Sequence, residues 1–274
     1  MWRVDGEPRA CVAPDDRGLA YGDGVFETVA VVAGQPALWP AHRRRLERGC
    51  ERLGFAPPAR AVLDREVEAF AGGADGVIKL IVTRGSGGRG YQPPMTPQPR
   101  VLAHRTSLPT RPPHWWQSGV RVIACRTCLA DQPALAGIKH LNRLEQVVAR
   151  TEWRDSEIAE GLMADAAGRV VEGTVTNLFA RFGRELRTPP LMRQGVAGIM
   201  RRRVIAEAGA LGLTPRVGAI SWGELENADE LWLTNSLVGL WPVRAFGDRR
   251  WRGFEYGHRM LSLMVKRQWV AVPV

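Results

Sequence analysis

The residue of this chain best suited to covalent chemistry is Lys139. The chain has 38 basic residues, yet only Lys79, Lys139 and Lys266 are lysines. Arginine keeps its proton, whereas a neutral lysine amine can form a Schiff base with a carbonyl group and then transfer protons. Lys139 is therefore a candidate catalytic residue. Scarcity alone leaves the simpler interpretation open, in which each lysine is a solvated surface charge.

Two glycine-rich segments could bind an anion. Residues 85–90 read Gly-Ser-Gly-Gly-Arg-Gly and follow an expected strand, which matches the spacing of a dinucleotide-binding loop. The prolines at 93 and 94 exclude that interpretation, because the loop would have to open a helix. Arg89 and Tyr91 remain candidates for anion contact. Residues 195–200 are expected to begin a helix, whose first backbone N–H groups favour a phosphate.

The cysteines indicate neither a metal site nor a redox site. The chain has four cysteines, which fits a reducing compartment. Cys125 and Cys128 form a C-x-x-C at the end of an expected strand over 120–125. Side chains three residues apart in an extended chain point to opposite faces, so we expect no shared metal ion.

Composition favours a soluble enzyme over a nucleic-acid-binding or membrane protein. The chain has 274 residues and a net charge of +10, and it contains no apolar run long enough to span a membrane. Its arginines are scattered, with short clusters only at 43–45 and 201–203, so the sequence does not favour nucleic-acid binding. The positive charge favours the binding of anionic small molecules. The first residues lack the apolar segment of a secretory signal, so we expect a cytoplasmic protein.

Periodicity predicts a mixed α/β fold with two domains. We expect strands over 25–32, 76–84, 100–105, 120–125, 161–165, 170–181, 230–234 and 241–245, and helices over 41–54, 63–71, 141–155 and 195–209. Three prolines within residues 108–113 mark a linker over 108–114. A small N-terminal α/β domain would occupy 1–107 and a larger C-terminal domain 115–274.

Five motifs in this order resemble the fold-type IV pyridoxal-phosphate enzymes, which include branched-chain aminotransferases, D-amino-acid aminotransferases and aminodeoxychorismate lyases. The likeness covers essentially the whole chain, and within the group the segments 84–91 and 135–147 look most like the lyases. It implies a small N-terminal domain and a larger C-terminal domain with a barrel-like sheet. The motifs are Tyr21-Gly-Asp-Gly-Val-Phe-Glu-Thr28, His42-x-x-Arg45-Leu46, Lys139, Val171-Glu172-Gly173-x-x-x-Asn177-Leu178-Phe179 and Gly195-x-x-Gly198-Ile199-x-Arg201.

The resemblance implies pyridoxal 5'-phosphate as cofactor and gives each matching residue a role. Lys139 would hold the cofactor as an aldimine and transfer protons, and Glu172 would face the pyridine nitrogen and keep it protonated. Arg45 would bind the phosphate; helical spacing alone does not separate it from Arg43. Further phosphate contacts would come from the helix start and a later turn, namely Gly198, Ile199, Met200 and Ser236. The substrate-binding candidates are Arg89, Tyr91 and Asn235.

The implied reaction converts 4-amino-4-deoxychorismate to 4-aminobenzoate and pyruvate. Lys139 would take the C4 proton before the enolpyruvyl group leaves. Phe26 stands where D-amino-acid enzymes carry a tyrosine, which argues against that branch. Two alternatives stay open: an aminotransferase on the same fold, and a basic binding protein that lost the chemistry. The resemblance also implies a homodimer.

Overall fold

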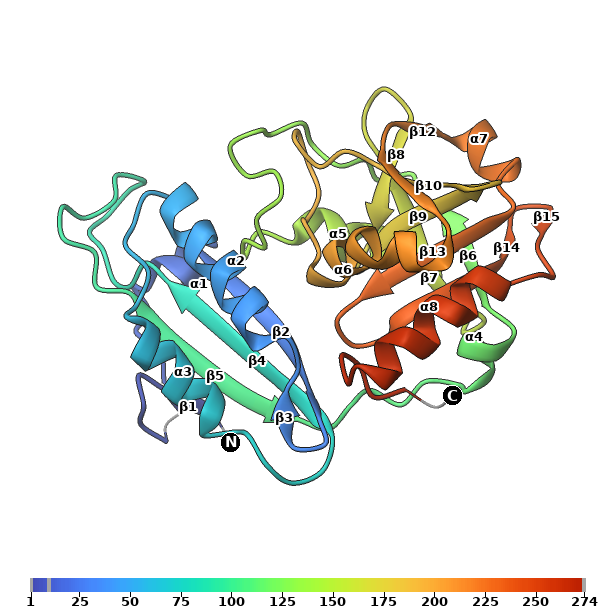
Figure 1. Cartoon of the computed structure of the whole chain (residues 1–274). Helices are drawn as coiled ribbons and strands as arrows, with labels where there is room; N and C mark the ends of the chain where they lie inside the picture. Colours follow the sequence, from blue (N-terminus) through green and yellow to red (C-terminus); the bar gives the residue numbers. More distant parts are fainter. Residues whose placement is uncertain (1, 9–10, 273–274) are drawn as a thin grey trace. The chain divides into compact units, whose positions relative to one another are not determined.

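The chain folds into two compact units, which Figure 1 colours from blue to red along the sequence. The computed structural model describes residues 2–8 and 11–272. The first unit runs as far as Pro109 and also contains Ile138–Asn142; the second contains Thr110–Gly137 and Arg143 onward.

The first unit is an antiparallel sheet with two helices over one face (Figure 1). Its strands are ordered β1-β5-β4-β2-β3, and β2 pairs with β4 along its length. Every second residue of β2, from Val25 to Val31, is buried, and valines of this face pack with Leu46 and Leu63 of the two helices. The elements are β1 (Trp2–Val4), α1 (Arg17–Tyr21), β2 (Gly24–Val32), β3 (Gln35–Pro36), α2 (Trp39–Arg52), α3 (Arg60–Glu68), β4 (Gly76–Thr83) and β5 (Arg100–Thr106).

One segment from the C-terminal half of the chain, Ile138–Asn142, belongs to the first unit. The backbone N–H of Phe26 donates to the Lys139 carbonyl at 2.9 Å, and the N–H of Leu141 donates to the Gly24 carbonyl at 3.0 Å. The segment therefore lies along the start of β2. These bonds also explain why the helix expected over 141–155 begins later: Leu141 is bonded to β2, and α5 spans Leu144–Arg150.

The second unit is built on a mixed sheet that closes on itself. Neighbouring strands run β9-β13-β14-β6-β7-β8, and a further pairing of β8 with β9 completes a barrel. Large side chains of its strands are fully buried, including Phe179, Trp232 and Trp241. The strands are β6 (Val120–Ala124), β7 (Ile158–Ala164), β8 (Arg169–Gly173), β9 (Asn177–Phe182), β10 (Glu185–Thr188), β11 (Thr214–Val217), β12 (Ile220–Ser221), β13 (Glu230–Asn235), β14 (Gly239–Phe246) and β15 (Arg249–Arg250).

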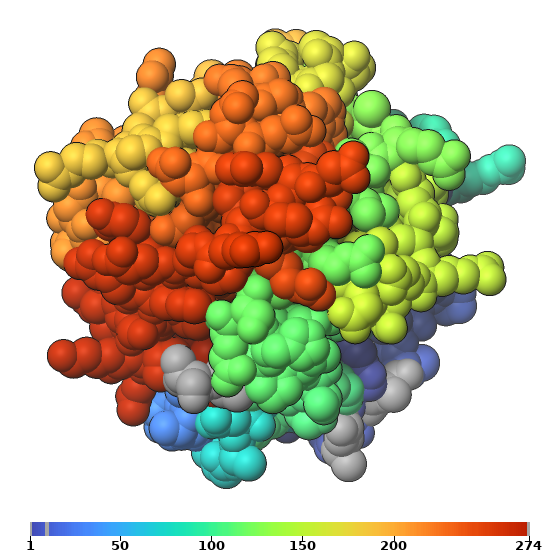
Figure 2. All heavy atoms as spheres, turned by 90° about the vertical axis from the view of Figure 1, so that its right-hand side faces the viewer, coloured from blue at the N-terminus to red at the C-terminus, as the bar shows by residue number. Residues whose placement is uncertain are grey.

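Helices cover parts of this sheet. Figure 2 shows one face of the unit, where the C-terminal segment in red lies beside the green segment that follows Pro109. A ring nitrogen of His258 in α8 lies 3.0 Å from the Trp116 carbonyl of α4, which joins these two segments. The helices are α4 (His114–Gln117), α6 (Ile199–Glu207) with a 3₁₀ turn over Ala208–Leu211, α7 (Trp222–Glu226) and α8 (Glu255–Lys266). Among the described residues no helix is long and apolar enough to cross a membrane.

The strand expected over 170–181 is interrupted at residues 174–176. The buried carboxylate of Glu160 accepts the backbone N–H groups of Thr174 and Val175 and the hydroxyl groups of Thr174 and Thr176. These bonds turn the chain away from the sheet, so that β8 and β9 become neighbours. A local pattern could not show this, because the acceptor lies on β7.

Gly161 on β7 is expected to be essential for packing of the barrel. An added Cβ at this position would overlap Cys125 Sγ and lie 2.7 Å from the Trp153 ring. Gly161→Ala should therefore lower the free energy of unfolding by about 1–3 kcal/mol, measured by urea denaturation. Gly223→Ala in α7 is the matched control, because nothing lies within 4 Å of its Cβ position. Equal stability of the two variants would contradict this packing.

Candidate active site

Lys139 lies beside the first residues of β2. Its main chain is held by Phe26, and the flanking His140 forms a bridge with Val25. The Lys139 side chain is half-buried, and its Nζ lies 4.3 Å from the centroid of the Phe26 ring. A cation or amine over an aromatic face is stabilised there without a hydrogen bond to the ring. The pairing with β2 thus holds the proposed catalytic amine in a defined place.

A buried charge cluster joins β2 to α2. The Glu27 carboxylate is fully buried and accepts two hydrogen bonds from Arg45, Nε to Oε1 at 2.8 Å and Nη2 to Oε2 at 2.6 Å. His42 Nδ1 lies 2.6 Å from Glu27 Oε2. Because residues 42 and 45 are three positions apart in a helix, both side chains reach the same carboxylate.

This cluster distinguishes Arg45 from Arg43. Arg43 turns to Asp64 of α3, with Nη1 to Oδ1 at 2.5 Å, whereas Arg45 pairs with the buried Glu27. Of these two arginines, Arg45 shares the cluster of Glu27 and His42, and its proposed role toward a phosphate stays a prediction.

The cluster shifts the pKa of two of its members. Burial raises the pKa of Glu27, but the charges and hydrogen bonds of Arg45 and His42 outweigh burial and lower it to about 2. Burial lowers the pKa of His42. The Glu27 carboxylate raises it, the cations Arg45 and Lys139 lower it, and the net shift is downward. His42 is therefore neutral at pH 7, and Glu27 is ionised.

In the second unit, Glu172 lies at the end of β8 with its carboxylate buried. Its Oε2 accepts a hydrogen bond from Asn177 Nδ2 at 3.0 Å and another from the Val196 backbone N–H at 2.9 Å. Asn177 Nδ2 also donates to the Val196 carbonyl at 2.9 Å. Asn177 thereby fixes the carboxylate and the segment that precedes α6.

The helix expected from residue 195 begins later, at Ile199. The Val196 and Ala197 N–H groups donate outside the helix, to Glu172 and to the Gly137 carbonyl. Gly198 is the N-cap, and an added Cβ there would overlap Asn177 Oδ1. In the part of the chain that the structure describes, no capping side chain accepts from the first turn of α6. This start has the geometry of an anion site.

The turn after β13 lies beside this cluster. Thr234 of β13 pairs with Asn177 of β9, and Asn177 pairs with Glu172. Asn235 Oδ1 accepts the backbone N–H groups of Leu237 and Val238, and its Nδ2 donates to the Val175 carbonyl. Asn235 therefore shapes the turn that carries Ser236, and its amide already has partners on both atoms.

The two loop candidates for substrate contact differ from the rest of the site in being exposed. Arg89 and Tyr91 belong to the first unit and lie between β4 and β5, and the Tyr91 side chain is 84% exposed. The Tyr91 ring meets Tyr21 edge-on, with 5.4 Å between centroids. Within each unit the structure thus gathers the predicted residues in two places: around Lys139 and Arg45, and around Glu172 and Gly198.

Comparison with known proteins identifies the family. A sequence profile described as amino-transferase class IV matches residues 24–246. The chain belongs to this family. The aminodeoxychorismate lyase of Vibrio harveyi is 38% identical over 244 residues, which cover 89% of this chain and 90% of the relative. The crystal structure of 4-amino-4-deoxychorismate lyase from Pseudomonas aeruginosa superposes with a TM-score of 0.93 at 49% identity, over 97% of this chain and 98% of the other.

Aminotransferases of the class IV family are also relatives. The D-alanine aminotransferase of Bacillus licheniformis is 28% identical over 236 residues, which cover 84% of this chain and 81% of the relative. The predicted mixed fold with a barrel-like sheet is confirmed by the close match to the Pseudomonas structure.

The motifs contain further residues to which the sequence assigned no role. Glu27 and Asn177 each hold a side chain that the family resemblance does name, Arg45 and Glu172, and His42 contacts Glu27. A signal for Asn177 was present, because it belongs to the same motif as Glu172. For Glu27 the only signal was a charged residue on the apolar face of a strand, which demands a buried partner.

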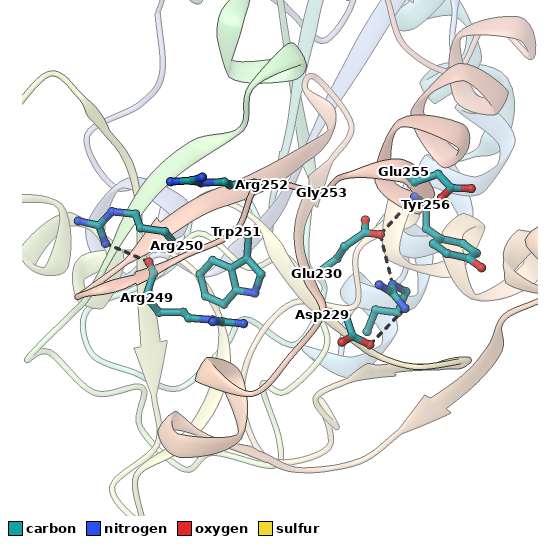
Figure 3. A pocket seen from close by; sticks show the side chains of 10 residues that line it. Asp229, Glu230, Arg249, Arg250, Trp251, Arg252, Gly253, Glu255 and Tyr256 are labelled. Atoms are coloured by element: carbon teal, nitrogen blue, oxygen red, sulfur yellow. Dashed lines mark hydrogen bonds and ion pairs between the residues drawn. The ribbon is translucent and has the colours of Figure 1, made fainter.

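A pocket of about 490 Å³ in the second unit contains none of the predicted site residues (Figure 3). On one side Arg181 pairs with Asp229 and Glu230, and on the other lies the arginine-rich hairpin around Trp251. We assign it no role. In the C-x-x-C pair Cys125 is buried and Cys128 is exposed, and both are free thiols.

The neutral His42 should make stability depend on pH. As the pH falls through 6.5, the usual pKa of histidine, the unfolded chain takes up a proton that the folded His42 does not. Stability should therefore decrease over this range, and His42→Asn should reduce the decrease. The test is the urea midpoint at pH 7.5 and 5.5. His114→Asn, an exposed histidine of α4, is the control and should keep the wild-type dependence. An unchanged dependence in His42→Asn would show that His42 is not the group responsible.

Proposed function

We propose that this chain is a pyridoxal-phosphate-dependent 4-amino-4-deoxychorismate lyase, which forms 4-aminobenzoate and pyruvate. The observation that carries the proposal is its 49% identity, at a TM-score of 0.93, to the Pseudomonas aeruginosa lyase over nearly the whole of both chains. The Vibrio harveyi lyase, at 38% identity, supports the same reaction.

The residues present fit the proposed cofactor. Lys139 offers an amine on a segment held by β2, and Arg45 offers a guanidinium. The first turn of α6 offers backbone N–H groups at Ile199 and Met200, in a place where Gly198 must lack a side chain. Glu172 offers a buried carboxylate with two fixed donors. A lysine amine suits a carbonyl, a guanidinium or a helix start suits a phosphate, and a buried carboxylate suits a basic ring nitrogen.

When bound, the cofactor supplies a carbonyl for the lysine and a ring that withdraws electrons. In the proposed reaction Lys139 removes the proton from C4 of the substrate and returns a proton to the departing pyruvate fragment. Glu172 holds the ring nitrogen in its protonated form. Arg45, the start of α6 and the turn at Ser236 hold the phosphate.

The substrate carries two carboxylates, so cationic and hydroxyl groups must receive it. Arg89 and Tyr91 are the proposed contacts, since both side chains are exposed on the glycine-rich loop. Asn235 is proposed to act by shaping the Ser236 turn, because its amide oxygen already accepts two backbone N–H groups. By family resemblance we also propose a homodimer, which sedimentation of the holoenzyme would test.

The second candidate is an aminotransferase, favoured by the D-alanine aminotransferase relative. Both reactions begin with the same proton removal and differ in whether a leaving group departs. The purified protein should release 4-aminobenzoate when supplied with aminodeoxychorismate made by a synthase in the same vessel, followed by fluorescence. Absence of 4-aminobenzoate together with rapid amino transfer from D-alanine would establish the aminotransferase instead.

Lys139→Ala should abolish lyase activity and the visible absorbance of bound cofactor, because the covalent link is lost. Lys79→Ala is the matched control, since Lys79 Nζ also lies near the Phe26 ring, 5.7 Å from its centroid, but on an exposed strand position. The control should keep both signals. A colourless wild-type protein with salt-sensitive affinity for nucleic acid would instead indicate a binding protein.

Glu172→Gln should keep the cofactor but lose most turnover, by about 100-fold or more, because a neutral amide cannot keep the ring nitrogen protonated. Glu160→Gln is the control: it alters another buried acid of the barrel, which accepts hydrogen bonds from the 174–176 loop and from the Gly161 N–H. We expect this variant to lose stability and to retain turnover per folded molecule. Near-normal rates in Glu172→Gln would remove Glu172 from its proposed role.

A further inference from the structure

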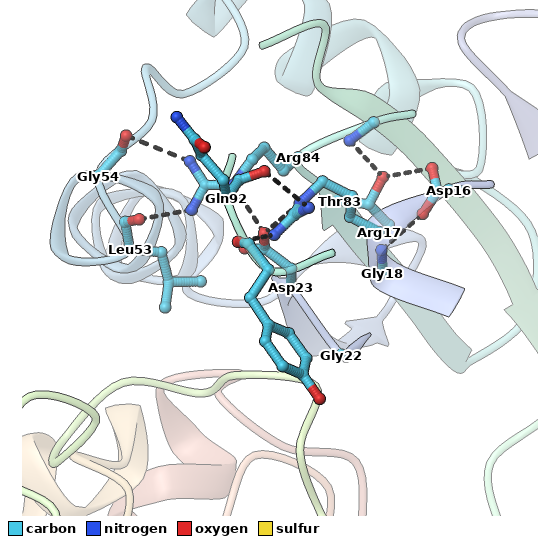
Figure 4. Close-up of polar contacts among 12 residues, drawn as sticks. Asp16, Arg17, Gly18, Gly22, Asp23, Leu53, Gly54, Thr83, Arg84 and Gln92 are labelled. Atoms are coloured by element: carbon cyan, nitrogen blue, oxygen red, sulfur yellow. Dashed lines mark hydrogen bonds and ion pairs between the residues drawn. The ribbon is translucent and has the colours of Figure 1, made fainter. Parts of the chain in front are cut away.

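The loop between β4 and β5, residues 84–99, is held by the side chain of Arg17. Arg17 begins α1 and is 4% exposed. Its guanidinium donates to three consecutive backbone carbonyls: Nη1 to Gly90 at 3.2 Å and to Gln92 at 3.3 Å, and Nη2 to Tyr91 at 2.9 Å. Figure 4 labels Arg17 and Gln92 and shows the side chain of Arg17 beside the carbonyl of Gln92. A planar group with five donors can bind such a set, whereas a lysine ammonium cannot.

A chain of charges fixes the Arg17 guanidinium. Its Nε donates to Asp23 Oδ2 at 2.9 Å, and the same oxygen accepts Arg84 Nε at 2.7 Å (Figure 4). Arg84 is buried and donates in turn to the carbonyls of Leu53 and Gly54, just after α2. Asp23 therefore links the loop, through two guanidinium groups, to the helix that carries Arg45.

Residues 15–17 hold the other side of the same loop. The Arg17 N–H donates to the Gly85 carbonyl at 3.0 Å, and Ser86 Oγ donates to Asp15 at 2.9 Å. The Arg17 stem passes beneath Gly87, where an added Cβ would lie 2.8 Å from Arg17 Cδ. The loop is thus held at 85–87 and at 90–92, and Arg89 lies between the two held stretches.

We propose that Arg17 is a positioning residue for substrate recognition, which acts by fixing the backbone that presents Arg89 and Tyr91. The inference rests on the proposed function, in which these two side chains contact the substrate carboxylates. Arg17 itself is buried and all three contacts described are to main-chain oxygen atoms, so its effect on the substrate is indirect. Fixing the loop beforehand removes an ordering cost from substrate binding.

The test combines kinetics with hydrogen exchange on the holoenzyme. Arg17→Lys keeps the charge but loses the carbonyl contacts. It should speed amide exchange over residues 88–92 and raise KM for aminodeoxychorismate by about tenfold, with kcat within about twofold of wild type. In an Arg89→Ala background the same change should raise KM little further, because Arg17 acts through the loop side chains.

Arg105 provides a matched control. It also donates to three carbonyls of one loop in the first unit, those of Phe70, Gly72 and Ala74, but that loop has no proposed contact with substrate. Arg105→Lys should speed exchange over 70–74 and leave KM unchanged. Asp23→Asn is a second test of the clamp: it keeps the Arg17 carbonyl contacts but weakens their anchor, so a smaller rise in KM is expected.

The outcomes separate this inference from the proposed function. Unchanged exchange over 88–92 in Arg17→Lys, or faster exchange with an unchanged KM, would overturn it. If Arg17→Lys does not fold, Asp23→Asn decides by the same two measurements. If the wild-type protein yields no 4-aminobenzoate, the lyase proposal fails, and exchange together with KM for D-alanine in amino transfer decides the role of Arg17.

Discussion

A carboxylate taken out of water must be surrounded by donors, and this requirement organises both units. Glu27 satisfies it with Arg45 and His42, which joins a strand to a helix. Glu160 satisfies it with the 174–176 turn, which sends the chain from β8 into β9. Each acid is buried by the core around it, so its donors must come from other elements. The acids thereby fix relations between elements that apolar packing alone would leave looser.

The preference for arginine has a structural consequence. Arg17, Arg84 and Arg105 each bind backbone carbonyls of loops far away in the sequence, where there is no regular strand to receive them. Lysine could not replace them, because its single ammonium cannot reach several fixed acceptors in a plane. The same bias leaves few amines in the protein. Lys139 can therefore be recognised against its background, whereas in a lysine-rich chain it would be one amine among many.

Local patterns in the sequence predicted the elements well and their long-range contacts poorly. The valine alternation of β2 and the apolar stripe of α2 are visible in any short window. The return of Ile138–Asn142 to the first unit is not visible in such a window, because it depends on hydrogen bonds to Gly24 and Phe26, more than 100 positions away. For the same reason Glu172 could be named by family resemblance, while its fixation by Asn177 and by the Val196 N–H needed coordinates. Buried polar residues in the motifs were the available hint, since each must have a partner somewhere.

The Glu27 pair also bears on how Arg45 would receive a phosphate. An arginine buried without a partner would be costly in the absence of ligand, and it would reorganise on binding. Pairing with Glu27 removes that cost and leaves the guanidinium in one orientation, at the expense of some net attraction for an anion. The proposed second contributor, the start of α6, has the complementary property of offering N–H groups that carry no charge to be neutralised. In its proposed role, therefore, Arg45 would contribute a fixed orientation more than net attraction.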